Sequence, residues 1–182
     1  PNFEVHWDAW ASPFGIQPHL TRASSGPSQG YHIDPVVNDL AEDFDKLRGG
    51  SFGADREKTK ARIAVAEDLF GDILPVKMTM GSLSGAITNP LVSLMGMENY
   101  YCSMYDYPEK LHEVMEMATR LYEDYYDFLE KEGLLLPTCG VSPVAQESFA
   151  FGGDPPEEAA ATTTQCWGFL EAQESTAPSP EP

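Results

Sequence analysis

The chain has 182 residues, of which 29 are acidic and 11 are basic, so its formal net charge is −18. This charge disfavours nucleic acids and anionic membrane surfaces as partners, because both are bound through clustered lysine and arginine. Charged residues make up 22% and hydrophobic residues 42% of the chain, which is typical of a globular domain. The longest apolar runs, such as residues 134–136, are far shorter than the ~20 residues that span a bilayer.

The three cysteines, Cys102, Cys139 and Cys166, are widely separated and form no CxxC pair. An odd number without paired spacing is a poor disulfide framework, so we expect reduced thiols and a cytoplasmic location. The first residues lack the basic start and the apolar stretch of a secretory signal. The chain begins with Pro1 instead of methionine, and we expect its natural start to be missing.

Residues 1–34 are expected to form an N-terminal β-hairpin region. Residues 3–7 (FEVHW) alternate apolar and polar side chains, which predicts a half-buried strand. Residues 23–30 are rich in Ser, Gly and Pro and are predicted to form a turn. Residues 31–33 would then return as the partner strand.

The spacing of apolar residues becomes helical from Asp34 onward. Asp34 is a suitable cap for a helix over residues 35–48 that opens with Pro35, since proline tolerates the first helical position. A second helix is predicted from its cap at Asp55 to Gly71.

Residues 73–80 follow as a short, mostly apolar run, which is typical of a buried strand. After a glycine-rich turn, Asn89 is expected to cap a short helix that Pro90 opens and that ends at Met95. Residues 98–105 are expected to add another helical turn or two.

The clearest helix opens at Pro108, carries a sustained apolar stripe and ends at Gly133. The sequence then predicts a strand over residues 134–136, a loop over residues 139–163 and a strand over residues 165–171. This succession of strands and helices predicts parallel α/β structure.

The loops that follow parallel strands form the site in such folds. Gln173, Glu174 and Ser175 directly follow a predicted strand. A carboxylate there can be a general base or can hold a polar group of a substrate; the alternative is a solvated loop end. Residues 81–85 (GSLSG) lack the Lys-Ser/Thr ending of a phosphate-binding loop. Ser82 therefore lies either in a tight turn or in a pocket lined by backbone amides.

Cys139 also follows a predicted strand, and the alternative to a functional role is a small, half-buried residue. The histidines show no HxxxH or HxC spacing, so a complete zinc site within the chain is not expected. We expect His112 to pack beside an apolar stripe. His32 lies near Asp34 in the sequence. The aspartate already has an expected role as a helix cap, so its proximity does not by itself indicate a function for His32.

Several motifs occur in an order that is similar to one protein family. They are FGDILPV (70–76), LMGMEN (94–99), MYDYPE (104–109), EGLL (132–135), WGF (167–169), QES (173–175) and SPE (179–181). Together they resemble the uroporphyrinogen decarboxylase superfamily over about residues 30–181. The greatest similarity is to its uncharacterised, decarboxylase-like branch.

The resemblance implies a (β/α)8 TIM barrel, of which this chain would be a part. Known activities of the superfamily include cofactor-free decarboxylation of the acetate arms of uroporphyrinogen. Others are methyl transfers between corrinoid proteins and a thiol or pterin, typically with zinc bound by His and Cys. In the decarboxylase a loop serine contacts the substrate, and Ser175 falls at that position. The substrate-binding tyrosine of the decarboxylase would fall near Asn89, and its arginine-bearing segment and catalytic aspartate have no match here.

The resemblance and the loop positions together give the expected site. We expect Glu174 and Ser175 to be catalytic, and the substrate-binding residues to be Gln173, Ser82, Asn89 and Cys139. No metal ligand and no cofactor is expected within the chain. A full-length relative would bind a small-molecule substrate, with zinc and a corrinoid protein as partners if it transfers methyl groups.

We expect three segments: a hairpin region over residues 1–34, part of the barrel over residues 35–174 and a proline-rich end over residues 175–182. A (β/α)8 barrel needs about 250 residues, so we expect an internal fragment that is inactive alone. The parent would act on a small molecule by decarboxylation or corrinoid-linked methyl transfer. The alternative is a non-catalytic, truncated barrel that serves as an assembly or binding module, and a homo-oligomer is compatible with both.

Overall fold

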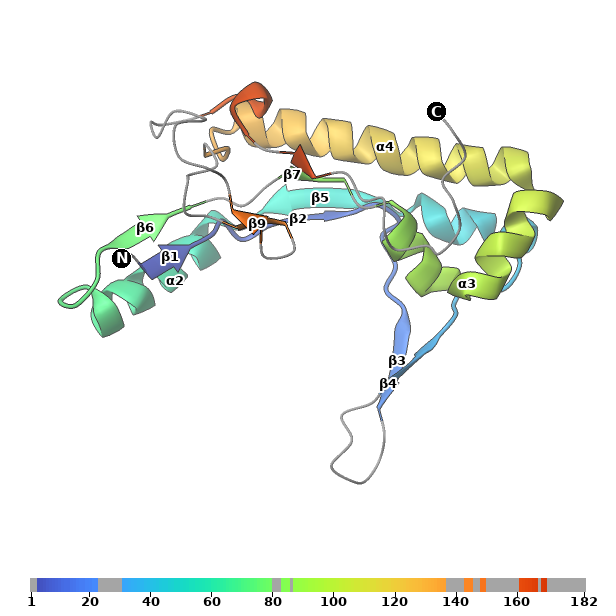
Figure 1. Cartoon of the computed structure of the whole chain (residues 1–182), viewed down its shortest axis with the longest axis horizontal. Coiled ribbons are helices and arrows are strands. Elements are labelled where there is room, and N and C mark those ends of the chain that lie inside the picture. Colours follow the sequence, from blue (N-terminus) through green and yellow to red (C-terminus); the bar gives the residue numbers. More distant parts are fainter. Residues whose placement is uncertain are drawn as a thin grey trace. The chain divides into compact units, whose positions relative to one another are not determined.

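The computed structural model describes residues 3–22, 31–79, 83–85, 87–136, 143–145, 148–149, 161–166 and 168–169 (Figure 1). Within them the chain is a mixed α/β structure, built from helices and from two-stranded sheets. The predicted α/β class is therefore confirmed, and these residues form no closed barrel. None of the helices in this part of the chain is long and apolar enough to cross a lipid bilayer.

Contacts divide the chain into two compact units, each built from segments that are distant in sequence. The first unit comprises Pro1–Ala11, Phe52–Ser84 and Glu123–Leu170, and the second comprises Ser12–Ser51, Gly85–Tyr122 and Glu171–Pro182.

The first unit contains a parallel pair of strands that are linked through a helix. Strand β1 (Phe3–Val5) pairs in parallel with β6 (Val76–Met78), and α2 (Arg56–Phe70) lies between them in the chain and packs on both. The strand predicted over residues 3–7 is confirmed, but its predicted partner, residues 31–33, is wrong. A helix that packs on both strands returns the chain parallel to β1, which a short hairpin turn cannot do.

Helix α2 begins as the sequence predicts and remains largely exposed. The carboxylate of its cap, Asp55, accepts the backbone N–H of Lys58 at 2.8 Å. The buried residues of α2 are Thr59 and Ala66. At the end of the helix, the ring of Phe70 stacks on Phe3 of β1 with the ring centroids 4.5 Å apart.

Shorter strands form two further pairs in the first unit. Strand β7 (Leu83–Ser84) pairs in parallel with β10 (Gly168–Phe169), which confirms a strand within residues 165–171. Strands β8 (Pro143–Ala145) and β9 (Ser148–Phe149) pair antiparallel in a stretch that the sequence predicts as loop. A two-residue connection and short strands give too little periodicity for such a hairpin to be predicted.

Strands β2 (Ala9–Ser12) and β5 (Ser51–Ala54) form another two-stranded sheet. Gly53 lies against the indole of Trp10, and a Cβ atom at Gly53 would lie only 2.8 Å from that ring. A larger residue at this position would force the half-exposed indole of Trp10 to shift.

Leu134 and Leu135 are buried, but residues 134–136 form no strand. Leu134 and Leu135 are 1% and 0% exposed and pack with Leu129 and Ala161. The backbone N–H of Ala161 donates to the carbonyl of Leu135 at 3.1 Å, which is a single bond instead of a ladder. The predicted strand is wrong, because an apolar run reports burial more directly than strand pairing.

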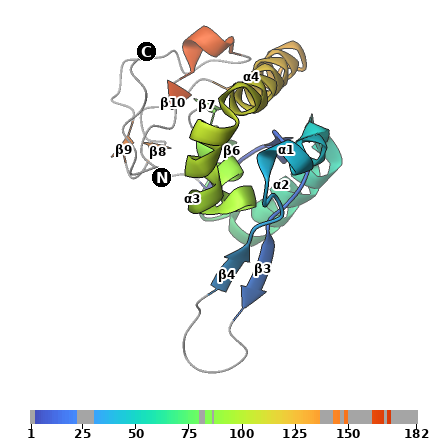
Figure 2. The ribbon, with the colours of Figure 1, turned by 90° about the vertical axis from the view of Figure 1, so that its right-hand side faces the viewer.

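The second unit contains the hairpin that the sequence predicts around residues 23–30. Strands β3 (His19–Arg22) and β4 (Tyr31–Asp34) lie side by side and antiparallel, with His19 opposite Asp34 (Figure 2). The predicted second strand is confirmed, whereas the first strand is His19–Arg22 and not residues 3–7. The predicted turn, residues 23–30, lies outside the described residues.

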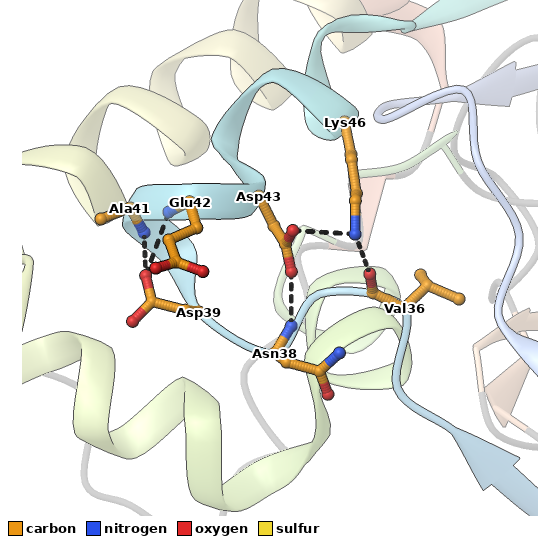
Figure 3. A network of polar contacts seen from close by, with 7 residues as sticks. All are labelled: Val36, Asn38, Asp39, Ala41, Glu42, Asp43 and Lys46. Atoms are coloured by element: carbon orange, nitrogen blue, oxygen red, sulfur yellow. Dashed lines mark hydrogen bonds and ion pairs between the residues drawn. The ribbon is translucent and has the colours of Figure 1, made fainter.

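Asp34 does not cap a helix, because it ends β4. Helix α1 (Leu40–Asp43) begins six residues later, and the 3₁₀ helix η1 (Phe44–Arg48) continues it. The carboxylate of Asp39 caps α1 by accepting the backbone N–H groups of Ala41 at 2.7 Å and Glu42 at 3.0 Å (Figure 3). The predicted end of this helix before Gly49 is confirmed.

Helices α3 (Thr88–Asp106) and α4 (Pro108–Lys131) follow in the chain, and a short 3₁₀ helix, η2 (Thr163–Gln165), comes after them. The predicted break in the first of them is confirmed, since Gly96 has a φ of 76° and interrupts α3. The long helix from Pro108 is also confirmed, and Gly133 ends it with a φ of 65°. The second unit has one apolar core, formed by Phe14, Val37, Leu40, Phe44, Leu47, Leu91, Leu94, Met95, Tyr100, Leu111, Val114 and Ala118.

Candidate functional site

Most of the site residues expected from the sequence lie outside the described residues. These are Ser82, Cys139, Gln173, Glu174 and Ser175.

Asn89 is described, and it is exposed in the first turn of α3. Ile87 occupies the N-cap position of that helix, so the predicted capping role of Asn89 is wrong. The other candidates lie outside the described residues, so their position relative to Asn89 is not described.

The structure instead shows a polar face on the parallel pair β1–β6. Successive side chains of a strand point to opposite faces, and Phe3 and Val5 face α2. Glu4 therefore lies on the opposite face, and Lys77 of β6 is in register with it. We call this surface the polar face; it consists of Glu4, His6, Lys77 and Thr79.

Thr79 connects the two strands on the polar face. Its backbone N–H donates to the carbonyl of Val5 at 3.0 Å, and its hydroxyl donates to a carboxylate oxygen of Glu4 at 3.3 Å. Its carbonyl oxygen lies 2.9 Å from Nδ1 of His6. A carbonyl oxygen accepts only, so Nδ1 of His6 carries the hydrogen and, in the neutral ring, Nε2 keeps its lone pair. His6 is exposed, and its Nε2 can therefore accept and return a proton.

The backbone of Asp8, which follows β1, is fixed by α2. Its N–H donates to the hydroxyl of Thr59 at 2.9 Å, and its carbonyl accepts the N–H of Asp55 at 2.7 Å. Thr59 is completely buried, and its hydroxyl donates to the carbonyl of Asp55 at 2.8 Å. The carboxyl end of β1 is therefore held rigidly against the first turn of α2.

The carboxylate of Asp8 is shared by two cations. Nζ of Lys58 lies 2.8 Å and a guanidinium nitrogen of Arg62 lies 3.7 Å from the same carboxylate oxygen. Asp55, whose carboxylate accepts the backbone N–H of Lys58, adds a second negative charge to this cluster. The charges therefore balance within the fold.

A buried hydrogen-bond donor lies between His6 and Asp8 in the chain. Nε1 of Trp7 is buried and has no hydrogen-bond partner in the described part of the structure. The guanidinium of Arg56 lies over the indole, 5.7 Å from the ring centroid, and donates to the carbonyl of Glu132 at 2.8 Å. Buried donors without an acceptor are rare in folded proteins.

A second polar cluster lies on the hairpin β3–β4. The carboxylate of Asp34 accepts the hydroxyl of Thr21 at 2.6 Å and lies 2.8 Å from Nδ1 of His19 and 3.5 Å from Nε2 of His32. The hydrogen bonds from Thr21 and His19 lower the pKa of Asp34. Asp34 is thus a partner of His19 and His32. The predicted role of Asp34 as a helix cap is wrong.

Polar contacts around α1 stabilise the helix start. Asp43 accepts the backbone N–H of Asn38 at 2.9 Å and pairs with Lys46 at 2.8 Å (Figure 3). The hydroxyl of Tyr107 donates to Asp39 at 2.9 Å. These bonds satisfy polar groups at the start of the helix. They are therefore explained by helix capping and do not indicate a ligand site.

The described residues do not fit a zinc site. No three of their His, Cys, Asp and Glu side chains gather closely enough to bind a metal ion. The thiol of Cys166 donates to the carbonyl of Leu136 at 3.4 Å, and burial, together with the nearby Glu130, raises its pKa. A thiol in this environment stays protonated, whereas zinc binds the thiolate.

The comparisons with known proteins give no neighbour for this arrangement. No protein-family model, no curated protein and no solved structure matches the chain.

Proposed function

We propose that the chain is part of a cytoplasmic, uroporphyrinogen decarboxylase-like (β/α)8 barrel protein that acts on a small molecule. The motifs between residues 70 and 181 support this proposal, since they resemble that superfamily in consistent order. The parallel pairs β1–β6 and β7–β10 also support it, because parallel strands joined through helices are the repeating element of such barrels.

The observation that carries the proposal is the polar face at the carboxyl end of β1 and β6. In (β/α)8 enzymes the reacting groups lie at the carboxyl ends of the strands. His6 follows β1 directly, and Thr79 follows β6 directly. The site proposed from the sequence, with Glu174 and Ser175 as catalytic residues and Gln173, Ser82, Asn89 and Cys139 against the substrate, would add to these groups.

The polar face suits decarboxylation. The ammonium group of Lys77 can hold a substrate carboxylate or another anionic arm by charge. Loss of CO2 breaks a C–C bond and leaves its electron pair on the substrate carbon, which then takes a proton. His6, held through Nδ1 on Thr79, can deliver that proton from Nε2 when the ring is in its imidazolium form, and the resulting neutral ring can take a proton back from solvent.

Corrinoid-linked methyl transfer is the second reaction open to the proposed family. The described residues do not fit a zinc ion, so we derive no step through zinc or a corrinoid. A zinc site of that reaction would take its ligands from other residues.

Two measurements on the protein with its natural flanking sequence test the proposal. Incubation with uroporphyrinogen, followed by mass spectrometry of the tetrapyrrole, should show loss of CO2. His6→Gln should slow that loss by a factor of about 10²–10⁴, the usual contribution of a general acid. A different result would be stoichiometric zinc in elemental analysis, methyl transfer from methylcobalamin to a thiol and no loss of CO2. That result would show that the reaction is methyl transfer and not decarboxylation. If the protein shows neither activity, the result favours the alternative, a non-catalytic assembly or binding module.

A further inference from the structure

Glu4 is a charged residue in the middle of a strand. It lies between Phe3 and Val5, which face α2, and its own side chain is partly buried on the polar face. Burying a carboxylate costs free energy unless a donor bonds to it. The hydroxyl of Thr79 is such a donor, at 3.3 Å from a carboxylate oxygen of Glu4. Glu4 therefore has a defined contact with the residue that follows β6.

Thr79 is held at two points. Its backbone N–H donates to the carbonyl of Val5 at 3.0 Å, and its hydroxyl donates to Glu4. Strand β6 ends at Met78, so the orientation of Thr79 depends on these two bonds. When the N–H and the side chain of a residue are both fixed, the direction of its Cα–C bond is fixed as well. The two bonds together therefore aim the carbonyl of Thr79.

The carbonyl of Thr79 in turn determines the chemical state of His6. It accepts hydrogen from Nδ1 of His6 at 2.9 Å, and in the neutral ring Nε2 then keeps its lone pair. If the carbonyl turned away, this preference would be lost and either nitrogen could carry the hydrogen. The contacts thus form a chain from the carboxylate of Glu4, through Thr79, to the imidazole of His6.

We propose that Glu4 is a positioning residue of the polar face. Its carboxylate holds Thr79, and Thr79 holds His6 with Nε2 free to take up and deliver a proton. The contribution of Glu4 to catalysis rests on the proposed function, whereas its effect on the tautomer of His6 follows from the contacts alone. Glu4 acts through Thr79 and has no direct part in the chemical step.

The hydrogen bond of Glu4, and not its charge, carries this role. Lys77 is in register with Glu4 on β6, so the polar face also contains a positive charge, and a second one when His6 is protonated. Glu4→Gln removes the negative charge and keeps an oxygen that accepts the hydroxyl of Thr79. Glu4→Ala removes both. The two substitutions therefore separate the hydrogen bond from the charge.

Long-range 1H–15N correlation spectra of His6 test the proposal without any substrate. Glu4→Ala should lower the ratio of the Nδ1–H to the Nε2–H tautomer by a factor of about 2–10, the usual worth of one hydrogen bond. Glu4→Gln should change that ratio by less than about twofold. Glu57→Ala is the matched control, since Glu57 is an exposed glutamate that pairs with Lys60 on α2, and α2 packs on the opposite face of β1 and β6. A wild-type ratio in Glu4→Ala, or equal losses in Glu4→Ala and Glu4→Gln, would overturn the proposal.

Thr79→Val tests whether Glu4 acts through Thr79. It removes the hydroxyl and keeps the carbonyl, so it should lower the tautomer ratio by the same factor as Glu4→Ala. The double variant should lower the ratio no further, because both substitutions break one and the same bond. Additive effects would show that Glu4 reaches His6 by another route and would contradict the proposal.

Turnover separates the role of Glu4 from the proposed function. Where the wild-type protein with its natural flanking sequence releases CO2 from uroporphyrinogen, Glu4→Ala should lower kcat by a factor of about 2–10. Its KM should stay within about twofold of the wild type, because His6 acts on the proton and not on binding. A wild type without turnover contradicts the proposed function, and the tautomer ratio still decides on Glu4. An unchanged kcat in an active Glu4→Ala variant would overturn the role of Glu4 in catalysis.

Discussion

Nδ1 of His6 lies 2.9 Å from the carbonyl oxygen of Thr79 and so links the carboxyl ends of β1 and β6. The two residues are 73 positions apart in the chain. The bond determines which nitrogen of the imidazole carries hydrogen, and it leaves Nε2 on the exposed side. The parallel pairing of β1 and β6 is therefore what gives His6 a defined chemical state.

This relationship predicts the tautomer of His6. In its neutral form, His6 should carry hydrogen on Nδ1, although the Nε2–H tautomer is the commoner one in free imidazole side chains. Long-range 1H–15N correlation spectra of uniformly labelled protein distinguish the two nitrogen shifts directly. His6→Gln identifies the signals by their loss, and a protonated Nε2 in the neutral ring would contradict the geometry.

Thr59 should contribute strongly to stability through its hydroxyl. Thr59→Val keeps the shape of the side chain, but it leaves the N–H of Asp8 without its acceptor. The carbonyl of Asp55 loses the hydroxyl and keeps the backbone N–H of residue 59. Leaving buried polar groups unpaired costs about 1–3 kcal/mol, so the free energy of unfolding in urea should fall by about that amount.

Two control variants separate the lost hydrogen bonds from other effects of the threonine. Thr59→Ser keeps the hydroxyl and should recover most of the loss. Thr119→Val removes an exposed hydroxyl that bonds only to Met115 of the same helix, and it should change the free energy of unfolding by less than about 0.5 kcal/mol. Equal losses for Thr59→Val and Thr119→Val would show that the contacts of Asp8 do not determine stability.

The sequence predicts the elements that local patterns determine. The cap Asp55, the break near Gly96 and the helix end at Gly133 are all confirmed, because each depends on residues within one turn of the chain. Asp34 shows where such reasoning fails, since an aspartate is equally suited to cap a helix or to bond with His19 across a hairpin. Only the pairing of β3 with β4 decides between the two.

The candidate site is also hard to predict, because its residues come together only through strand pairing. The alternation over residues 3–7 correctly indicates a strand with a polar face, and the rule about carboxyl ends of strands would have selected His6 and Asp8. In an antiparallel hairpin, which the sequence predicts here, the rule does not select them. The parallel register with β6 depends on contacts 73 residues apart, such as Glu4 with Lys77, and no local pattern reports it.

Trp7→Phe should cost little stability, although the indole packs in a core cluster. The substitution removes a buried donor that has no acceptor in the described residues, and relief of that donor offsets part of the lost packing. We expect the free energy of unfolding to fall by less than about 1 kcal/mol, compared with about 3–5 kcal/mol for Trp→Ala in a core. A loss above about 2 kcal/mol for Trp7→Phe would mean that the N–H has an acceptor elsewhere in the protein.

The hairpin β3–β4 should lose stability at acidic pH because of Asp34. The hydroxyl of Thr21 and then His19 lower the pKa of this carboxyl from its ordinary value of 3.8. A group whose pKa is lower in the folded state stabilises the fold above its unfolded pKa, and the contribution is lost as the pH falls through the folded value. The stability contribution of Asp34 is therefore lost at pH values below about 4, where the unfolded chain takes up the proton first.

A 13C-detected titration of the Asp34 carboxyl should give a midpoint below 3.8. Thr21→Val should move that midpoint upward, since it removes the largest cause of the shift, while His32→Gln should move it less. A midpoint at or above the ordinary value in the wild type would contradict the hydrogen bonds that define the cluster.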